Sequence, residues 1–507
     1  MKLNIIIGGK AGQGINKVSE IIGNVLNKYG YFTFNYRDYA SLIRGGHNFN
    51  TLCISDSLIE SHDAKVDILV ALDDLSIKTH KAALKKNGTT ILGEQFKDLG
   101  RNINVALAGT IIKILGIPLV ELEKEIKSQF KDYSKALEAA KQGYDSQETQ
   151  QKLTKLKASP TTLSGSQAIA KGAVNSGLDL YIAYPMTPAT NTMHELAANQ
   201  IENNLMVFQA ENEISAASMA IGASFAGARV MTGTSGGGFD LMGETLSLQG
   251  IAEIPLTVSL VSRPGPGTGV PTYTAQSDLD IALRSGHGEA PRVVVAPGNP
   301  KEAIDKTSEA LFLAEKFKTL SIILSDKHLT ESEFSSIQKP MKTIKFKITR
   351  TLPGKDLVKS SSYETDKFGN STESYTLTEQ NTNARIKKYN DIKKFVNKKF
   401  EMIKIHGDSK SKNLIIGWGS TSGAIKDAIK DLDAKFLQVL YCKPLSPKIK
   451  KEMKKAENII LVECNVTGQL GRLIREKTGI KIENRLLKYN GRPFHADELN
   501  SLIKSII

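Results

Sequence analysis

Runs of apolar residues alternate with stretches of helical periodicity along most of the chain. The first such unit is LNIIIGGKAGQGINKVSEIIGNVL, where an apolar run ends in glycines and Ile15, Val18, Ile22 and Val25 then recur at helical spacing. Similar units lie near the C-terminus, in LIIGWGSTSGAIKDAI and IILVECNVTGQLGRLIREKTG. Apolar strands that alternate with amphipathic helices are typical of parallel α/β layers. The pattern predicts an α/β protein whose first helix begins near Gly14.

The length of 507 residues predicts about three domains. We expect a first domain over residues 1–155, a second over 160–340 and a third over 392–507. The connector between the last two, 341–391, contains KSSSYETDKFGNSTESYTLTEQNTN, which is polar and poor in apolar periodicity. A structureless segment of this length is uncommon in compact proteins, so ordered strands within the connector remain an alternative.

The formal net charge of +14 leaves two interpretations open. It could indicate a polyanionic partner such as nucleic acid, or lysines scattered over solvated surfaces. The lysines are scattered, and in the densest patch, KKFVNKKFEMIKIHGDSKSK, Phe395 and Phe400 fit a core better than a base-stacking platform. We therefore expect no nucleic-acid partner.

Cysteine content and hydropathy point to a cytoplasmic protein. The three cysteines, Cys53, Cys442 and Cys464, are far apart, which argues against a disulfide framework and a CxxC metal site. No run of about 18 apolar residues exists, so no membrane span is expected. The N-terminal apolar stretch turns to glycine at once and fits a buried strand better than a signal peptide.

The proline-rich segment Pro-Met-Thr-Pro interrupts YIAYPMTPATNTMHELA, which runs from Tyr181 to Ala197. The pattern predicts a buried strand ending at Pro185, with Thr187 as the N-cap of a helix and Pro188 at its first position. The free amides at such a helix start would favour an anion at the C-terminal edge of a sheet. An ordinary capped loop explains these residues equally well.

Two glutamates precede a helix rich in small residues in FQAENEISAASMAIGASFAG. Small residues allow close packing, so Glu213 could be buried, and a buried carboxyl needs a compensating partner. The alternative is that Glu211 and Glu213 simply complement the helix dipole. The glycines 236–238 that follow the next strand could form a turn close to a ligand, although this signal is weak.

An arginine opens a Pro/Gly-rich loop after another apolar strand, in IPLTVSLVSRPGPGTGVPTYTAQSDL. A rigid loop that carries Arg263 would suit bidentate binding of a carboxylate. A solvated loop arginine is the equally plausible alternative.

Taken in order, these segments resemble the 2-oxoacid:ferredoxin oxidoreductases, specifically an α subunit with a γ-type domain fused at its N-terminus. GGKAGQG and IRGGHN look like the γ-type domain. YPMTP, ENEISAASMAIGASFAG, TSGGGFDLM and RPGPGTGVPT look like the thiamine pyrimidine-binding domain. NLIIGWGSTSGAI and VECNVTGQLGRLIR look like a transketolase C-terminal-like domain. The resemblance implies three Rossmann-like or thiamine-enzyme-type α/β domains.

The resemblance also implies roles for individual residues. Thr187 and Arg263 correspond to residues that bind the 2-oxoacid, and Arg263 would hold its carboxylate. Glu213 corresponds to the catalytic glutamate that bonds the N1′ atom of the thiamine aminopyrimidine. Pro185 and Gly236 are expected to line the same cofactor.

The chain lacks the Gly-Asp-Gly of a diphosphate and magnesium site and the cysteine spacing of an iron–sulfur cluster. The resemblance therefore implies a thiamine diphosphate site shared in a heterodimer with a β subunit that carries Mg²⁺ and a [4Fe-4S] cluster. Coenzyme A would be the co-substrate and ferredoxin the electron acceptor.

Four positions depart from the family pattern and put the choice of 2-oxoacid in doubt. Met186, Gly237, Gly267 and Tyr273 stand where isoleucine, proline, serine and a basic residue are common. The fused architecture favours 2-oxoglutarate or a broad range of 2-oxoacids. A pyruvate-specific enzyme, or another thiamine-dependent ketol transferase or decarboxylase, is the alternative.

Overall fold

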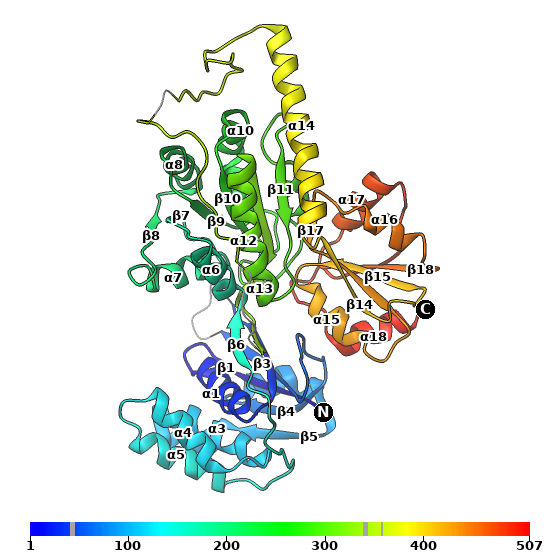
Figure 1. Cartoon of the computed structure of the whole chain (residues 1–507). Helices are drawn as coiled ribbons and strands as arrows, with labels where there is room; N and C mark the ends of the chain where they lie inside the picture. Colours follow the sequence, from blue (N-terminus) through cyan, green and yellow to red (C-terminus); the bar gives the residue numbers. More distant parts are fainter. Residues whose placement is uncertain (41–45, 338–342, 356–357) are drawn as a thin grey trace. The chain divides into compact units, whose positions relative to one another are not determined.

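The computed structural model describes residues 1–40, 46–337, 343–355 and 358–507 (Figure 1). The described chain forms two compact units. Unit 1 contains residues 1–163, 332–340 and 495–499, and unit 2 contains residues 164–331, 341–494 and 500–507. Of the motifs expected in the γ-type domain, residues 43–45 of IRGGHN lie outside the described residues.

Unit 1 is built on a seven-stranded sheet with the order β5-β4-β1-β3-β2-β13-β6. Its strands are β1 (Lys2–Lys10), β2 (Phe32–Asp38), β3 (His47–Ser55), β4 (Val66–Ala71), β5 (Leu84–Leu92), β6 (Thr161–Ser164) and β13 (Glu333–Ser336). Its helices are α1 (Ile15–Lys28), α2 (Asp74–His80), α3 (Ile103–Ile114), α4 (Leu119–Gln129) and α5 (Ser134–Asp145). The predicted helix start is confirmed, because Gly14 is the N-cap of α1.

The expectation of purely parallel layers is wrong for this sheet. β1 pairs with β4 in parallel, but it pairs with β3 antiparallel, and β2 pairs antiparallel with both β3 and β13. The reason is connectivity: only the eight residues 39–46 separate β2 from β3, whereas parallel neighbours require a crossover connection of about a dozen residues or more.

Unit 2 contains a second seven-stranded sheet with the order β17-β11-β12-β10-β9-β7-β8. Its strands are β7 (Leu180–Ala183), β8 (Met206–Gln209), β9 (Val230–Thr234), β10 (Leu256–Ser262), β11 (Arg292–Val295), β12 (Leu320–Asp326) and β17 (Tyr441–Lys443). All of the neighbouring pairs are parallel except β11 with β17.

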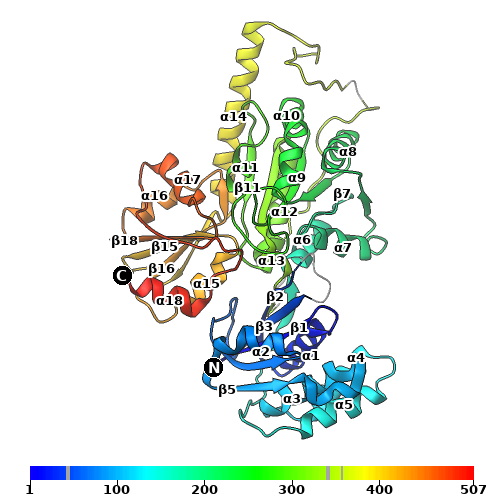
Figure 2. The ribbon, with the colours of Figure 1, turned by 180° about the vertical axis from the view of Figure 1, so that it is seen from behind.

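Helices cover both faces of this sheet. α6 (Gly165–Asn175) and α12 (Pro300–Phe317) pack against each other on the face seen in Figure 1. The view from behind in Figure 2 shows α9 (Gly236–Leu241), α10 (Gly243–Ala252) and α11 (Leu279–Arg284). Remaining helices of this part are α7 (Thr190–Ala198), α8 (Glu213–Ala226) and α13 (Lys327–Glu331).

Strand β10 shows why the sheet is buried on both sides. All seven of its residues are buried, and Leu256, Val258 and Leu260 share one core cluster with side chains of α8–α11. A near-continuous apolar strand is typical of a parallel sheet covered by helices on both faces. The C-terminal ends of β7, β9 and β10 consequently lie at the same edge of the sheet, where α/β proteins bind ligands.

A five-stranded sheet in the same unit has the order β14-β16-β15-β18-β19. Its strands are β14 (Ile403–Gly407), β15 (Asn413–Trp418), β16 (Lys435–Val439), β18 (Asn458–Glu463) and β19 (Asn484–Leu487). Its helices are α15 (Thr421–Ala428), α16 (Lys448–Met453) and α17 (Gln469–Thr478), and the last helix of the chain, α18 (Ala496–Lys504), contributes residues to both units. Both C-terminal strand–turn–helix units expected from the sequence are present, as β15–α15 and β18–α17.

The expected connector is more ordered than its composition suggested. Residues 375–391, the last part of the expected connector, form the first part of α14 (Tyr375–Lys399). This helix has 25 residues, of which only Ile392 and Val396 are buried. Because most of this helix faces solvent, it lacks the apolar stripe by which helices are predicted. Near its end Phe395 and Phe400 pack around Phe312 of α12, which confirms their expected place in a core.

The proposed three-domain division remains a prediction, because the second and third ranges lie together in unit 2.

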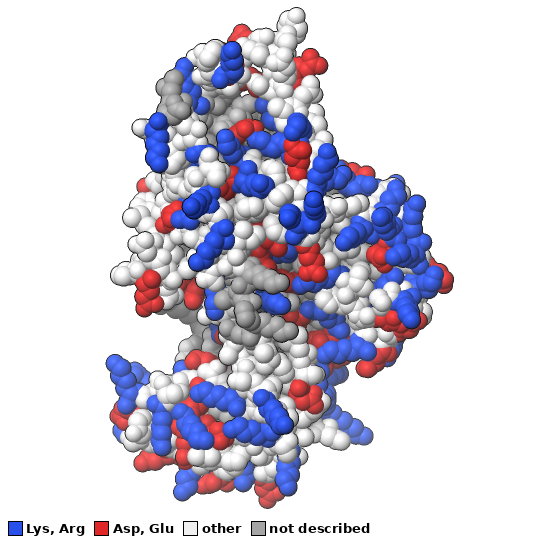
Figure 3. All heavy atoms as spheres, in the orientation of Figure 1, with Lys and Arg blue, Asp and Glu red and all other residues white. Residues whose placement is uncertain are grey.

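On the face drawn in Figure 3, Lys and Arg side chains are interspersed with Asp and Glu.

Candidate active site

The proline-rich segment, residues 185–188, follows β7 at the C-terminal edge of the second sheet. Its structure differs from the expected cap: the helix begins at Thr190, its N-cap is Ala189, and no side chain caps it. The Thr187–Pro188 peptide is cis. Thr187 lies in the turn before the helix. Its carbonyl oxygen accepts a hydrogen bond from the Arg263 side chain, instead of the first backbone hydrogen bond of the helix. The N-cap prediction for Thr187 is therefore wrong.

Glu213 is the first residue of α8, with Asn212 as the N-cap. The Asn212 side chain accepts a hydrogen bond from the Ser215 amide at 2.9 Å, so the capping function belongs to Asn212. Glu213 is only 4% exposed, and its Oε1 atom has no hydrogen-bond partner among the described residues. Glu211, two residues earlier, is exposed. Burial of Glu213 with an unpartnered oxygen favours a ligand role over the dipole alternative.

The glycine triplet begins α9 instead of forming the expected turn. A Cβ atom on Gly238 would lie 2.2 Å from Thr234 Oγ1 and 2.6 Å from Glu213 Cγ, so only glycine fits beside the Glu213 side chain. A Cβ atom on Gly236 would lie 2.6 Å from the Asp278 carboxylate. The two glycines therefore make room for two carboxyl groups at one helix start.

Arg263 directly follows β10, and its Nη1 atom donates to the Thr187 carbonyl oxygen at 2.6 Å. Burial lowers the pKa of Arg263, while the charges of Asp278 and Glu213 act in the opposite direction. The guanidinium thus lies close enough to both carboxyl groups for their charges to interact with it. It remains protonated at neutral pH, as a carboxylate-binding group requires.

Asp278 is a member of this site that sequence reasoning missed. It closes the Pro/Gly loop, and burial raises its pKa to about 6, with the charge of Asp240 adding to the effect. The nearby hydroxyls of Ser262 and Ser277 and the charge of Arg263 oppose this rise. The only available signal was an acidic residue at the end of the loop that Arg263 opens, and it has no characteristic spacing.

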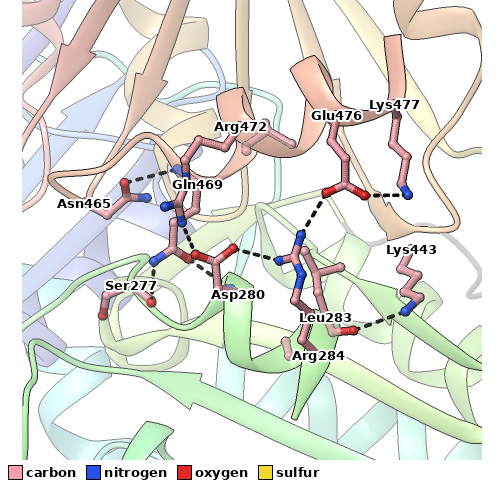
Figure 4. A network of polar contacts seen from close by, with 12 residues as sticks. Ser277, Asp280, Leu283, Arg284, Lys443, Asn465, Gln469, Arg472, Glu476 and Lys477 are labelled. Atoms are coloured by element: carbon pink, nitrogen blue, oxygen red, sulfur yellow. Dashed lines mark hydrogen bonds and ion pairs between the residues drawn. The ribbon is translucent and has the colours of Figure 1, made fainter. Parts of the chain in front are cut away.

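The far end of the Pro/Gly loop is fixed by residues that follow β18. Asn465 donates to the carbonyl oxygen of Gln276 at 3.0 Å, and Gln469 donates to that of Ser277 at 2.7 Å. Beside these bonds, Figure 4 shows ion pairs that join α11 to α17. Arg472 pairs with Asp280 and Arg284 pairs with Glu476 between the two helices, and Arg284 also pairs with Asp280 within α11.

Of the expected site residues, Thr187 and Arg263 are in direct contact, and the charge of Glu213 acts on Arg263. Gly236 lies beside Asp278, which was not among the expected residues. Pro185 is half-buried beside Met186, whose sulfur lies 4.0 Å from Thr234 Oγ1.

The structure bears on three of the four family departures. A Cβ atom on Gly237 or Gly267 would meet nothing within 4 Å, but the φ of +63° at Gly267 favours glycine there, whereas nothing in the structure explains Gly237. The ring of Tyr273, where a basic residue is common, carries the guanidinium of Arg492 at 3.7 Å from its centroid.

The residues fit one half of a thiamine diphosphate. The unpartnered, buried Glu213 oxygen is suited to a protonated ring nitrogen, and the Gly238 cradle holds that carboxyl in place. Among the described residues, no group of three or more His, Cys, Asp or Glu side chains is placed to hold a metal ion. None of the helices among the described residues combines the length and the apolar character that a membrane span requires.

Two family models match the sequence. One, described as pyruvate flavodoxin/ferredoxin oxidoreductase, thiamine diP-bdg, matches residues 171–401, which include Thr187, Glu213 and Arg263. The other, described as pyruvate ferredoxin/flavodoxin oxidoreductase, matches residues 4–98 in unit 1.

A structural likeness supports the fold. A solved structure of a 2-oxoglutarate:ferredoxin oxidoreductase from Magnetococcus marinus superimposes with a TM-score of 0.90, over 99% of both chains, at 24% identity. At this identity the likeness shows that the two chains share a fold.

Curated relatives settle the family. The 2-oxoacid:ferredoxin oxidoreductase subunit alpha of a Sulfolobus species is 31% identical over an alignment that covers all of this chain and 97% of that protein. Subunit alpha of 2-oxoacid:ferredoxin oxidoreductase 1 from Sulfurisphaera tokodaii is also 31% identical, over all of this chain and 98% of the relative. This chain therefore belongs to the family of 2-oxoacid:ferredoxin oxidoreductase alpha subunits.

Proposed function

We propose that this chain forms the aminopyrimidine side of a thiamine diphosphate site in an enzyme that oxidatively decarboxylates a 2-oxoacid. The products would be acyl-coenzyme A and carbon dioxide, with ferredoxin reduced. The observation that carries this proposal is the Glu213 carboxyl, which is buried, unpartnered at Oε1 and cradled by Gly238. It lies within the segment that matches the thiamine-binding family model.

Each side chain of the site has a distinct task. Bound thiamine diphosphate supplies the electron sink for loss of carbon dioxide from a 2-oxoacid. Glu213 holds the proton at N1′ of the aminopyrimidine, because its buried oxygen has no other donor among the described residues. Arg263 binds the substrate carboxylate, and its bond to the Thr187 carbonyl fixes the guanidinium beside the proline turn.

A second chain is proposed to cover this site. Large apolar side chains are exposed on the segments that carry it: Tyr184, Ile214, Met219, Leu241 and Leu248. We infer that these side chains belong to an interaction surface, because exposed apolar patches mark such surfaces. The curated relatives are themselves named alpha subunits, which implies a partner. We propose a β subunit that brings Mg²⁺, the diphosphate site and a [4Fe-4S] cluster.

Unit 1 offers a site for part of coenzyme A. A cavity of about 640 Å³ is lined by Gly12 and Gln13 of the GGKAGQG loop together with Lys97, Arg101 and Asn104. Lysine and arginine beside a glycine-rich loop are suited to phosphate groups. This cavity supports the proposal that unit 1 helps to bind the co-substrate.

The proposed substrate is 2-oxoglutarate or a broad range of 2-oxoacids. A relative from Archaeoglobus fulgidus, named a 2-oxoglutarate synthase subunit, is 40% identical over 34% of this chain. 2-Oxoglutarate has two carboxylates, and Arg492 places a second cation against the loop that Arg263 opens. A pyruvate-specific enzyme remains the second candidate.

The test is to purify the chain together with its partner subunit and assay reduction of a viologen dye without oxygen. We expect dye reduction that requires coenzyme A and a 2-oxoacid, with kcat/KM for 2-oxoglutarate at least equal to that for pyruvate. Release of carbon dioxide without dye reduction would instead indicate a non-redox decarboxylase. No turnover of any 2-oxoacid would contradict the proposal.

A further inference from the structure

A second cavity in unit 2, of about 390 Å³, shares no lining residue with the candidate active site. The turn between α10 and β10 borders it, as does the residue that follows α12. Segments 350–351 and 358–365 of the connector and residues 381–385 of α14 close it. Pockets that hold small molecules have volumes of about 300–1,000 Å³, so this cavity has room for a small metabolite.

The wall of this cavity carries more cations than carboxylates. Its charged residues are the cations Lys318, Arg350, Lys359 and Arg385 and the carboxylates Glu253 and Glu364. Ion pairs already engage both arginines and both carboxylates of the wall: Arg350 with Glu315, Arg385 with Glu364 and Lys388 with Glu253. The arginines and carboxylates therefore contribute little net charge.

Two lysines of the wall keep their charge uncompensated. Lys359 donates a hydrogen bond to the neutral side chain of Asn370 at 2.5 Å, and neither Lys359 nor Lys318 forms an ion pair with any described residue. The two lysines come from different segments, the connector and the end of α12, and both line the same cavity. Two unpaired cations at one cavity attract an anion.

Two helix ends that border the cavity adopt a backbone conformation that favours glycine. Glu253 ends α10 with a φ of 53°, and Lys318 ends α12 with a φ of 48°. Residues with a Cβ atom are uncommon in this left-handed region, and glycine or asparagine is preferred at such helix ends. Backbone strain of this kind concentrates at functional sites, which indicates that these two side chains are needed where they are.

The uncharged part of the wall has an apolar and a hydroxyl-bearing contribution. Phe225, at the end of α8, and the buried Ile254 and Pro255, before β10, contribute apolar surface. Ser360 and Thr365 of the connector contribute hydroxyl groups, which can donate hydrogen bonds to phosphate oxygens. The wall thus suits a molecule with an apolar body and a phosphate group.

We propose that this cavity binds a small organic phosphate, with its phosphate group beside Lys318 and Lys359 and its apolar body against Phe225 and Ile254. Lysine ammonium groups and hydroxyls together bind phosphate oxygens, and the apolar wall adds affinity that an inorganic ion cannot use. The inference goes beyond the proposed function, because binding at this cavity requires no 2-oxoacid.

The first test is calorimetric titration of the full-length chain, with any partner that copurifies, using AMP, inorganic phosphate and adenosine as probes. AMP carries both the phosphate and an apolar body, so it should bind at least about tenfold more tightly than either of the other two. Equal affinity for AMP and inorganic phosphate, or for AMP and adenosine, would overturn the proposal.

The second test changes the two lysines. Lys318→Asn removes the charge and keeps a residue that tolerates the left-handed conformation, and it should weaken AMP binding at least about fivefold. Lys359→Gln, at an exposed position, should weaken it similarly, whereas Lys318→Arg should stay within about twofold. Lys347→Asn, an exposed lysine of the connector outside the cavity, is the matched control and should bind as the wild type does. Unchanged binding in Lys318→Asn and Lys359→Gln would overturn the proposal.

Hydrogen exchange locates the bound probe. We expect AMP to slow amide exchange in residues 358–365 and 381–385, which line the cavity. Protection confined to residues 93–104, which line the cavity of unit 1, would show that AMP binds there instead and would overturn the proposal. None of these measurements uses turnover, so failure of the proposed function and failure of this inference are observed separately.

Discussion

At the scale of single residues, the site depends on the lack of a side chain at Gly238. Gly238 leaves space for the Glu213 carboxyl and for Thr234 Oγ1, whereas its neighbour Gly237 faces open space. These adjacent glycines occupy the same turn of α9, so they form a matched pair for testing whether the cradle matters.

We expect Gly238→Ala to reduce turnover at least tenfold, because its Cβ atom would displace the Glu213 side chain. Gly237→Ala should retain turnover and stabilise α9 by roughly 0.5–1 kcal/mol, since alanine favours helices over glycine. The measurement is viologen reduction by the two purified complexes, together with their thermal unfolding. Equal loss of turnover in both variants would remove the cradle from the explanation.

Prediction from sequence was most successful where residue type and position coincide in a strong local pattern. Burial of Glu213 was expected because small residues pack closely at the start of its helix, and its 4% exposure confirms that expectation. Asp278 could not be predicted, because its place in the site arises from a loop that is folded back and anchored by Asn465 and Gln469, through contacts that span 189 and 192 residues. Such long-range contacts leave no periodicity in the sequence.

At the scale of elements, a buried carboxyl holds the turn between β18 and α17. Glu463 is fully buried and accepts hydrogen bonds from Trp418 Nε1, Asn465 Nδ2 and the amides of Leu470 and Gly471, at 2.7–3.2 Å. Because Asn465 in turn anchors the Pro/Gly loop, Glu463 supports the site indirectly.

Glu463→Ala should lower the free energy of unfolding by about 3–5 kcal/mol, because it leaves buried donors without an acceptor. Trp418, the only tryptophan in the chain, lies within this cluster and reports its unfolding by fluorescence in urea. Glu483→Ala, at an exposed position near the same sheet, is the control and should change stability by less than about 0.5 kcal/mol. A similar small change in Glu463→Ala would show that the turn does not depend on this carboxyl.

Elements were predicted well where an apolar strand met a glycine turn and an amphipathic helix, as in β1–α1 and β15–α15. The first half of α14 was missed because it packs on little: most of its residues are exposed and its sequence is polar. The mixed sheet of unit 1 was also missed, because strand direction follows from connection geometry and not from apolar alternation.

At the scale of the whole molecule, acid should lower the stability of unit 1 through its histidine pair. In unit 1 the Nε2 atoms of His47 and His80 lie 2.8 Å apart. Burial and the charge of His47 lower the pKa of His80 to about 4, while Asp73 and Asp38 face His47. The folded state therefore binds this proton less readily than the unfolded state does.

Because the folded pKa is below the unfolded value, stability from neutral His80 is complete above about pH 6.5 and is lost as pH falls toward 4. We expect unit 1 to lose about 2 kcal/mol between pH 7 and pH 5 from this group. Pulse proteolysis in urea, with fragments of residues 1–163 identified by mass spectrometry, measures the change. His80→Gln should flatten this dependence, whereas the exposed His194→Gln in unit 2 should leave it unaltered.

We propose that Glu213 serves a cofactor ring nitrogen from one wall of a site shared between two chains. The chain provides its own control, because Glu211 lies two residues away and is exposed. The most direct test compares coenzyme-A-dependent viologen reduction by Glu213→Gln and Glu211→Gln, each purified with the partner subunit. We predict at least a hundredfold loss of kcat in Glu213→Gln and less than a twofold change in Glu211→Gln. Turnover above about a tenth of the wild-type rate in Glu213→Gln would contradict the account.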